Sequence, residues 1–335
     1  MNLENEQLTY IVVDTANMFM RARHVVRGDD MYTKIGMAYH IMFNSINKVF
    51  REQNGTHVVI CLEGRSWRKD VYEPYKRNRK AVLAAKTERE QEEDAQFWEA
   101  FDELQTFFKN KTNCTVLQHG ECEADDFIAR WIHNHPNDKH VIVSSDSDYY
   151  QLINENVSQY NGITQELITL NGVFNDKGKP VIDKKTKEPK LIGDPEWLLF
   201  EKCIRGDTSD NIFSAFPGAR KKGTKNKVGM LEAFEDRDSK GYNWNNFMLQ
   251  RWVDHDNVEH RVLEDFQRNM MLIDLTQQPD NIKTVLDEAI VEQVQKDRKA
   301  QVGVHFMKFC GKHNLDNVSK NATDHAVYLN AGYGS

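Results

Sequence analysis

The 335-residue sequence has few of the features that mark disulfide-linked or membrane proteins. Its five cysteines are an odd number without the paired spacing of a zinc site, so we expect reduced, buried thiols. No apolar run approaches the roughly 20 residues that a membrane span requires, and the N-terminus lacks a signal-peptide pattern. We therefore expect a soluble cytosolic protein with no membrane partner.

Common catalytic motifs are also missing. The sequence has no Gly-x-Gly-x-x-Gly motif and no Walker loop, which argues against a dinucleotide-dependent enzyme and against an ATPase. No Ser-His-Asp or Cys-His arrangement is evident either. The chemistry, if there is any, must come from other residues.

The sequence does contain two acidic clusters that follow apolar runs. One opens a predicted helix after residue 122, and the other follows a predicted buried strand at residues 140–143; their members are Glu123, Asp125, Asp126, Asp146 and Asp148. Glu123 and Asp126 share a helix face, and Asp146 and Asp148 share one side of an extended segment. Carboxylates this close repel one another, and a hard divalent cation is the usual physical answer. Helix-dipole partners and a solvated loop remain the alternative explanations.

Two more acidic residues stand directly after predicted strands. The apolar run at residues 10–13 ends at Asp14, and the run at residues 58–62 ends at Glu63. Open parallel α/β sheets place their ligands at the carboxyl ends of their strands. Amphipathic helices at residues 35–50 and 97–108 would cover such a sheet. We therefore expect an α/β fold with a mainly parallel central sheet flanked by helices.

Residues 65–80 combine seven basic residues with two acidic ones and three aromatic ones. Cations neutralise phosphates and aromatic rings stack on bases, so this composition suits a nucleic-acid strand, although a solvated basic loop is the simpler alternative. Residues 86–94 are highly charged and lack an apolar stripe, and we expect them to be mobile or only partly helical.

The second half of the chain begins with an expected helix from Asp194 and Pro195 to Gly206, followed by Asp207 and Asp210. A turn at residues 216–229, before a helix at Met230, holds five basic residues: Arg220, Lys221, Lys222, Lys225 and Lys227. Its glycines would expose backbone N–H groups to phosphate. We expect an exposed hairpin at residues 171–191, helices over 245–290 and a polar tail from residue 317.

The formal net charge of -7 does not exclude a nucleic-acid partner. Nine acidic residues belong to the clusters described above, and setting them aside leaves a balance of +2. Because distribution matters more than the sum, this balance permits a nucleic-acid partner without demanding one.

Together these motifs resemble the 5'-to-3' exonuclease and flap endonuclease family, most closely its tailed-bacteriophage members of the phage ribonuclease H type. The resemblance covers roughly residues 8–275 and is most specific at residues 123–126, 144–148 and 206–212. It implies a PIN-like nuclease core at residues 1–193 with a helical arch at about 65–94. It also implies a helix-turn-helix-type duplex-binding region at 194–290 and a C-terminal helical segment with a polar tail at 291–335.

The resemblance implies roles for individual residues. Asp14, Glu63, Glu123 and Asp125 would hold a first metal ion, and Asp146, Asp148 and Asp210 a second, with Asp207 nearby and Asp126 completing the acidic wall. Lys76 would contact the scissile phosphate with help from Arg79. The residues that would bind nucleic acid are Arg65, Arg68, Tyr75, Lys76, Arg77, Arg79 and the five basic residues of the turn. In the family the second-strand carboxylate is normally Asp, and Glu63 is one methylene longer.

Two Mg²⁺ ions, for which Mn²⁺ could substitute, would activate a water and stabilise the leaving oxygen of a phosphodiester. The resemblance also implies a K⁺ site at the turn of residues 218–227, although this turn is longer and more basic than the family's compact glycine motif. The expected substrates are DNA and RNA–DNA duplexes with 5' ends or flaps, as in RNA primer removal during phage-type replication in a host cytoplasm. We expect a monomer, with a single-strand-binding protein or a sliding clamp as candidate partner of the C-terminal region.

Two other functions remain open from the sequence. A compact single-strand ribonuclease of the related acidic-pocket fold would share the carboxylates but would not require the basic turn. A non-catalytic structure-specific DNA-binding protein would be favoured if acidic positions were missing, and they are present.

Overall fold

The computed structural model describes residues 7–25 and 30–334, and the chain divides into two compact units. The first unit comprises residues 1–66, 86–192 and 280–335, and the second comprises residues 67–85 and 193–279. The contacts therefore group most of the expected arch region with the helical region, and the C-terminal helices with the sheet.

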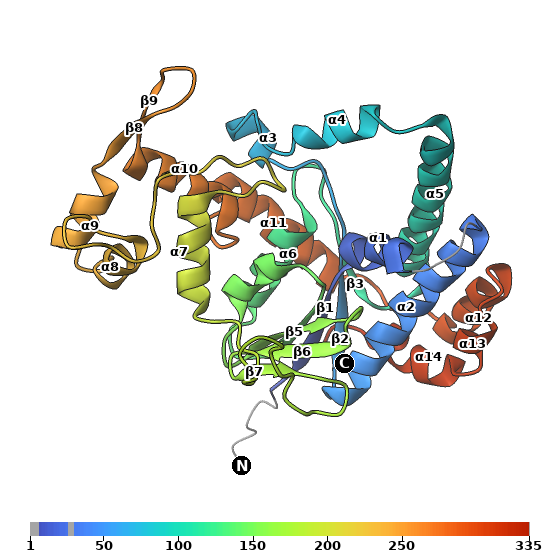
Figure 1. Ribbon diagram of the computed structural model, residues 1–335. Coiled ribbons are helices and arrows are strands. Elements are labelled where there is room, and N and C mark those ends of the chain that lie inside the picture. The colour runs from blue at the N-terminus through green and yellow to red at the C-terminus, as the bar shows by residue number, and fades with distance from the viewer. Residues whose placement is uncertain (1–6, 26–29, 335) are drawn as a thin grey trace, which may run out of the picture. The chain divides into compact units, whose positions relative to one another are not determined.

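A seven-stranded sheet forms the centre of the first unit, in the order β3-β2-β1-β4-β5-β6-β7 (Figure 1). Its strands are β1 (Thr9–Asp14), β2 (His57–Cys61), β3 (Thr115–Leu117), β4 (Lys139–Val143), β5 (Val157–Asn161), β6 (Glu166–Thr169) and β7 (Gly172–Phe174). The first five strands in the sheet order are parallel, and β6 and β7 continue it antiparallel. The expected mainly parallel α/β fold is confirmed.

Helices cover both faces of this sheet, which explains why its central strands are apolar on both sides. Ile11 and Val13 of β1 share a core with Phe43 and with aromatic residues further along the chain. On the other face, Tyr10 contacts Trp131 with ring centroids 5.2 Å apart. The helices of this unit are α1 (Thr15–Val25), α2 (Met31–Glu52), α5 (Glu88–Lys111), α6 (Ala124–Asn134), α11 (Asp280–Val294), α12 (Val302–Lys312), α13 (Asp316–Ser319) and α14 (Ala322–Asn330), with a 3₁₀ helix, η1, at Ser147–Leu152.

The second unit is mainly helical and has its own apolar core. Its elements are α3 (Arg68–Val71), α4 (Asn78–Ala84), α7 (Pro195–Arg205), α8 (Met230–Glu235), α9 (Tyr242–Met248), β8 (Arg251–Val253), β9 (Glu259–Arg261) and α10 (Val262–Ile273). Asp194 caps α7 by accepting the N–H of Glu196 at 3.0 Å, Pro195 is its first residue, and Gly206 ends it, as expected. Trp197, Phe200 and Phe234 lie in the core of this unit.

The expectation of a mobile segment at residues 86–94 is wrong. Helix α5 begins at Glu88, where Thr87 and Glu90 form a reciprocal cap: the N–H of Thr87 donates to the Glu90 carboxylate at 2.8 Å, and the N–H of Glu90 donates to Thr87 Oγ1 at 3.3 Å. Lys86 also pairs with Asp94. Capping and ion pairs thus stabilise a first turn that has no apolar stripe.

Two C-terminal expectations are also corrected. The region 245–290 is not continuously helical, because β8 and β9 form a hairpin whose turn is closed by Asp254, which accepts the N–H of Val258 at 2.9 Å. The expected polar tail is helical in part. His325 and Tyr328 of α14 are fully buried, and His325 lies 5.2 Å from the ring of Phe306.

Other expectations hold. Beyond the buried Val173, residues 171–191 form mostly exposed hairpin turns, closed by bridges from Phe174 to Pro180 and from Ile182 to Pro189. All five cysteines are buried, and none of them is in a disulfide. Among the residues that the structure describes, none forms a helix long and apolar enough to cross a bilayer.

Two histidines are buried at the amino ends of the central strands. Burial lowers the pKa of His57 to about 4 and, together with the charge of His135, the pKa of His140 to about 3. Both ring nitrogens of His140 are buried without a hydrogen-bond partner in the described structure. In the unfolded chain such histidines titrate near pH 6.5.

Acid should therefore destabilise the protein through these histidines. As the pH falls below about 6.5, His57 and His140 bind protons in the unfolded chain but stay neutral in the folded protein. The free energy of unfolding should therefore fall by on the order of 1–2 kcal/mol for each histidine by pH 5. We expect His140→Phe to flatten the decline in unfolding free energy between pH 7.5 and pH 5, measured by urea denaturation. The exposed His255 provides the control, and His255→Asn should leave the slope unchanged. Equal slopes for wild type and His140→Phe would contradict the assignment.

Candidate active site

The acidic residues of the first unit gather at the carboxyl ends of adjacent parallel strands. Asp14 is the last residue of β1 and pairs in register with Cys61 of β2, two residues before Glu63. On its other side β1 pairs with β4, whose end leads to Asp146. The strand order reverses between β1 and β4, which is the position where open α/β sheets bind ligands.

Asp14 is almost fully buried and receives three hydrogen bonds. Its Oδ2 accepts the hydroxyls of Ser144 and Tyr149, each at 3.0 Å, and its Oδ1 accepts the N–H of Asn17 at 3.2 Å. Burial nevertheless raises its pKa to about 6, because desolvation outweighs these bonds and the charge of Asp146 adds to it. A bound cation would favour the charged form of Asp14.

The carboxylates at the start of α6 form a tight group. Oxygens of Glu123, Asp125 and Asp126 all lie within 4.8 Å of one another. Ser66 donates to Glu123 at 2.6 Å, and Glu63, which is exposed, accepts the N–H of Ala124 at 3.2 Å.

Helix capping explains part of this group but not all of it. Asp126 accepts the N–H of Glu123 at 3.0 Å, as a capping residue does, and Glu63 accepts one further N–H of the same helix start. The Glu123 carboxylate completes this cap by accepting a backbone N–H of the first turn, so capping leaves only Asp125 of the group unexplained. A divalent cation with oxygen ligands would account for all three carboxylates.

Asp146 and Asp148 lie on a turn that buried side chains hold in place. Asp146 caps η1 by accepting the N–H of Asp148 at 3.0 Å. The fully buried Gln159 of β5 donates to the carbonyls of Ser144 and Asp146, both at 2.8 Å. Asn17 accepts the N–H of Ser145 at 3.0 Å.

Tyr149 lies close enough to several of these carboxylates for their charges to affect its pKa. Its hydroxyl is buried, and burial raises its pKa strongly. The negative charges of Asp14, Asp125, Glu63 and Asp146 raise it further, so carboxylates from four separate segments act on one phenol. The sequence interpretation missed Asn17, Ser66, Tyr149 and Gln159. Asn17, Ser66 and Tyr149 lie within three residues of an acidic residue singled out in the sequence, and only Gln159 is too far from one to have been suspected.

In the second unit, Asp207 and Asp210 lie on the loop after α7 and have basic partners of their own. Asp207 pairs with Lys202 at 2.7 Å and accepts the Ser209 hydroxyl at 2.6 Å. Burial alone would raise the pKa of Asp207, but these bonds and the charge of Lys202 lower it to about 2. Gly206, with φ +75°, permits the tight turn, because a Cβ there would lie 2.3 Å from the Ile212 carbonyl oxygen.

The loop of Asp210 binds the segment from Pro74 to Arg79. Asp210 accepts Arg79 at 2.8 Å and the Tyr75 hydroxyl at 3.1 Å, and Lys76 Nζ lies 3.6 Å from its Oδ2. The N–H of Lys76, a residue with φ +55°, donates to the Asp210 carbonyl at 2.8 Å. The structure therefore brings both predicted catalytic cations to the one carboxylate.

Two of the expected nucleic-acid contacts are corrected. Arg68 is 1% exposed, and its Nε donates to the carbonyl of Leu272 at 2.8 Å. Tyr75 is 3% exposed and lies in the core of the second unit. The interleaved basic and aromatic residues of this segment predicted that it binds a nucleic-acid strand. The pattern does not show which of these side chains are buried and which are exposed. Arg65, Arg77 and Arg79 are exposed.

The basic turn presents side chains rather than backbone donors. Its five basic residues, Arg220, Lys221, Lys222, Lys225 and Lys227, are all exposed. The N–H groups of Gly223 and Gly229, however, donate to the carboxylate of Glu232 at 3.0 Å. The expectation that these glycine N–H groups bind phosphate is therefore wrong, because the sequence interpretation did not foresee that Glu232 would take them.

Comparison with known proteins agrees with this geometry. The family model described as "5'-3' exonuclease, N-terminal resolvase-like domain" matches residues 9–178. The match covers half of the chain, includes the carboxylates of the first unit and defines a nuclease class. The chain belongs to the 5'-3' exonuclease family, as its motifs indicated.

Individual relatives are distant. The chain is 26% identical over 261 residues to DNA polymerase I of Rhizobium leguminosarum, but spans only 22% of that protein. It is 24% identical over 230 residues to the flap endonuclease Xni of Shewanella woodyi, which covers 68% of this chain and 78% of the relative.

Solved structures share the fold. The zinc-bound 5'-exonuclease of phage T5 superposes with a TM-score of 0.58 at 19% identity, covering 85% of this chain and 99% of that one. The flap endonuclease of phage T5, in a pseudo-enzyme-product complex with DNA and metal ions, gives a TM-score of 0.53 at 18% identity over 95% of this chain and 99% of that one.

Ligation of a divalent cation by Asp14 predicts a measurable effect of its phenol partner. Tyr149→Phe keeps the ring but removes the hydroxyl that orients Asp14, so we expect Mn²⁺ affinity to fall roughly tenfold or more, measured by calorimetry without substrate. The adjacent Tyr150 has no hydrogen bond from its hydroxyl in the described structure, so Tyr150→Phe is a matched control that should bind Mn²⁺ as the wild type does. If both variants kept full affinity, Tyr149 would have no role in orienting a ligand.

Proposed function

We propose that this chain is a divalent-metal-dependent 5' nuclease that cleaves DNA and RNA–DNA duplexes at 5' ends and flaps. The observation that carries the proposal is the convergence of seven carboxylates at one edge of the first unit's sheet: Asp14, Glu63, Glu123, Asp125, Asp126, Asp146 and Asp148. Removal of RNA primers in phage-type replication is the corresponding role.

The donor set fits hard divalent cations. All seven side chains offer oxygen, the ligand atom that Mg²⁺ and Mn²⁺ prefer, and the five cysteines of the chain are buried thiols. Two such ions would supply an activated water and a stabilised leaving oxygen. The carboxylates would bind the ions, and Ser144, Tyr149 and Gln159 would keep Asp14 and the Asp146 turn in position.

The roles of Asp207 and Asp210 at the second metal ion, and the potassium site, are proposed from the family resemblance. Asp210 already has Lys76 and Arg79 as partners within its own unit, so any metal ion that it bound would compete with these cations. We assign Lys76 and Arg79 to the phosphate of the substrate, and the five exposed cations of the turn to the duplex backbone. Association with a single-strand-binding protein or a clamp, and the monomeric state, likewise remain predictions.

The exposed basic turn favours a duplex substrate over the single-strand ribonuclease alternative. A comparison of Mg²⁺-dependent cleavage of a 5'-flap duplex and of single-stranded RNA separates the two. Preferential cleavage of the flap supports the proposal, and preferential cleavage of the single strand supports the ribonuclease. Lack of cleavage of either with metal present would leave only a binding function.

Replacement of one ligand should abolish chemistry before it abolishes binding. We expect Asp125→Asn and Asp148→Asn to lose flap cleavage in Mg²⁺ while retaining most of their affinity for the flap duplex. Each variant removes a carboxylate charge that metal binding requires and that binding of the duplex does not. Gel-based cleavage and anisotropy measure the two quantities, and excess chelator should abolish wild-type cleavage. Full cleavage by either variant, or in chelator, would overturn a two-metal mechanism.

Lys76 should act on the chemical step. Lys76→Ala should lower the single-turnover rate at saturating substrate by roughly 10² to 10³, the scale for loss of one preorganised charge-stabilising group. Affinity should change far less, because other exposed cations remain. Arg77→Ala is the control: Arg77 is exposed, pairs with Glu73 and should leave the rate within a few fold. Weak binding with a normal rate at saturation would make Lys76 a steering residue instead.

A further inference from the structure

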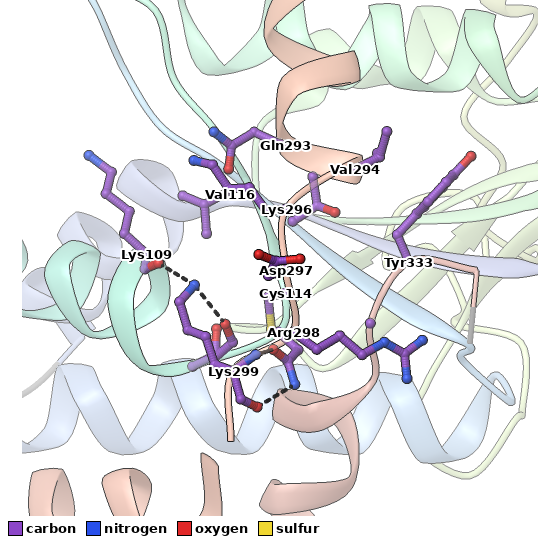
Figure 2. A pocket seen from close by; sticks show the side chains of 14 residues that line it. Lys109, Cys114, Val116, Gln293, Val294, Lys296, Asp297, Arg298, Lys299 and Tyr333 are labelled. Atoms are coloured by element: carbon purple, nitrogen blue, oxygen red, sulfur yellow. Dashed lines mark hydrogen bonds between the residues drawn. The ribbon is translucent and has the colours of Figure 1, made fainter. Parts of the chain in front are cut away.

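A small basic hollow lies in the first unit, away from the carboxylates. It is formed by the end of α5, the residues that lead into β3, the loop after α11 and the C-terminal residues Gly332 and Tyr333 (Figure 2). It therefore lies at the amino end of β3, whereas the carboxylates follow the carboxyl ends of the strands. None of the motifs discussed so far includes it.

The hollow has an excess of positive charge. Its lining includes four cationic side chains, Lys109, Lys296, Arg298 and Lys299, against one acidic side chain, Asp297. Within the described part of the chain, no carboxylate lies within 4 Å of the cationic groups of Lys109, Arg298 or Lys299, and Lys296 pairs only with Glu292 of the preceding helix α11, at 3.6 Å. Burial, followed by the charge of Lys296, lowers the pKa of Lys299.

Several of these groups are held by the fold. Lys299 Nζ donates to the carbonyls of Lys109 at 2.7 Å and Thr112 at 3.3 Å (Figure 2). The backbone of Lys299 exchanges two bonds with the Asn113 side chain, at 2.7 and 3.2 Å. Arg298 lies against Gly332, where a Cβ would come within 2.9 Å of its Nε. The hollow is thus a site with fixed walls rather than a set of unconnected surface lysines.

We propose that this hollow binds a phosphate group. A guanidinium beside ammonium groups suits a tetrahedral anion with several acceptor oxygens and more than one charge. The cavity of about 50 Å³ has room for a group as small as a single phosphate. Bound phosphate would relieve the repulsion that the clustered cations exert on one another.

The phosphate can come from two sources. The carboxylates follow the carboxyl ends of the parallel strands, whereas the hollow lies at the amino end of β3. The phosphate bound here is therefore not the one that is cleaved among the carboxylates. It is either a free phosphate or mononucleotide phosphate, or a distant phosphate of a nucleic-acid backbone.

Calorimetry with inorganic phosphate at constant ionic strength tests the site. Lys296→Gln with Arg298→Gln removes two cations that are exposed, and leaves Lys299, which also caps α5. We expect saturable binding by the wild type and at least a tenfold loss of affinity in this double variant. Lys184→Gln with Lys308→Gln is a control that removes two exposed cations elsewhere in the same unit, and it should bind as the wild type does.

A second measurement separates the sources. Anisotropy with a short blunt duplex in chelator should show weaker binding by a turn variant, Lys221→Gln, Lys222→Gln and Lys225→Gln, which serves as the positive control. If the hollow variant also binds the duplex more weakly, the backbone is a source; if only its phosphate affinity falls, the source is a small phosphate. Wild-type behaviour of the hollow variant in both measurements, or equal losses in the Lys184 and Lys308 control, would overturn the proposal. Neither readout depends on cleavage, so failure of the proposed nuclease function would not affect it.

Discussion

Mutual repulsion of carboxylates is the constraint on which the arrangement of the first unit depends. The parallel sheet brings Asp14 and the residues after β2 and β4 to one edge, and the start of α6 adds Glu123, Asp125 and Asp126. In water such groups would move apart, but here the strands and the helix fix their backbones. The protein offsets the cost only in part, with hydroxyl and amide donors. Burial first, and then the charge of Asp146, raises the pKa of Asp14 in spite of these donors.

The hydrogen bonds around this edge make the carboxylates rigid rather than neutral. Ser144 and Tyr149 hold one oxygen of Asp14, and Gln159 holds the carbonyls of the adjacent turn. Groups that orient a metal ligand contribute to affinity although they never touch the ion. In the second unit, ion pairs fix Asp207 and Asp210, because each has a basic partner within hydrogen-bonding distance.

Much of the fold followed from local patterns in the sequence. Apolar runs that end in Asp14 and Glu63, and helix signals such as Asp194 and Pro195, are local, and the structure bears them out. What could not be predicted depends on contacts between distant segments. Arg68 is buried and donates to the carbonyl of Leu272, which lies 204 residues away in the sequence. Gln159 donates to a turn that precedes it by more than a dozen residues. Residues 86–94 misled for a different reason, since a cap and ion pairs replaced the apolar stripe that periodicity detects.

The Glu232 carboxylate divides the basic turn into fixed and replaceable parts. A Cβ on Gly223 would lie 2.5 Å from the Lys227 carbonyl oxygen, and one on Gly229 would lie 2.4 Å from the Gly223 nitrogen. Neither glycine can therefore be replaced by a residue with a side chain. Because the N–H groups of both glycines donate to Glu232, this carboxylate fixes the distance between the two glycines. The residues between them, from Thr224 to Lys227, are exposed and lie outside this clamp. Evolution or a designer can accordingly change the length and charge of that tip while its base keeps the same geometry.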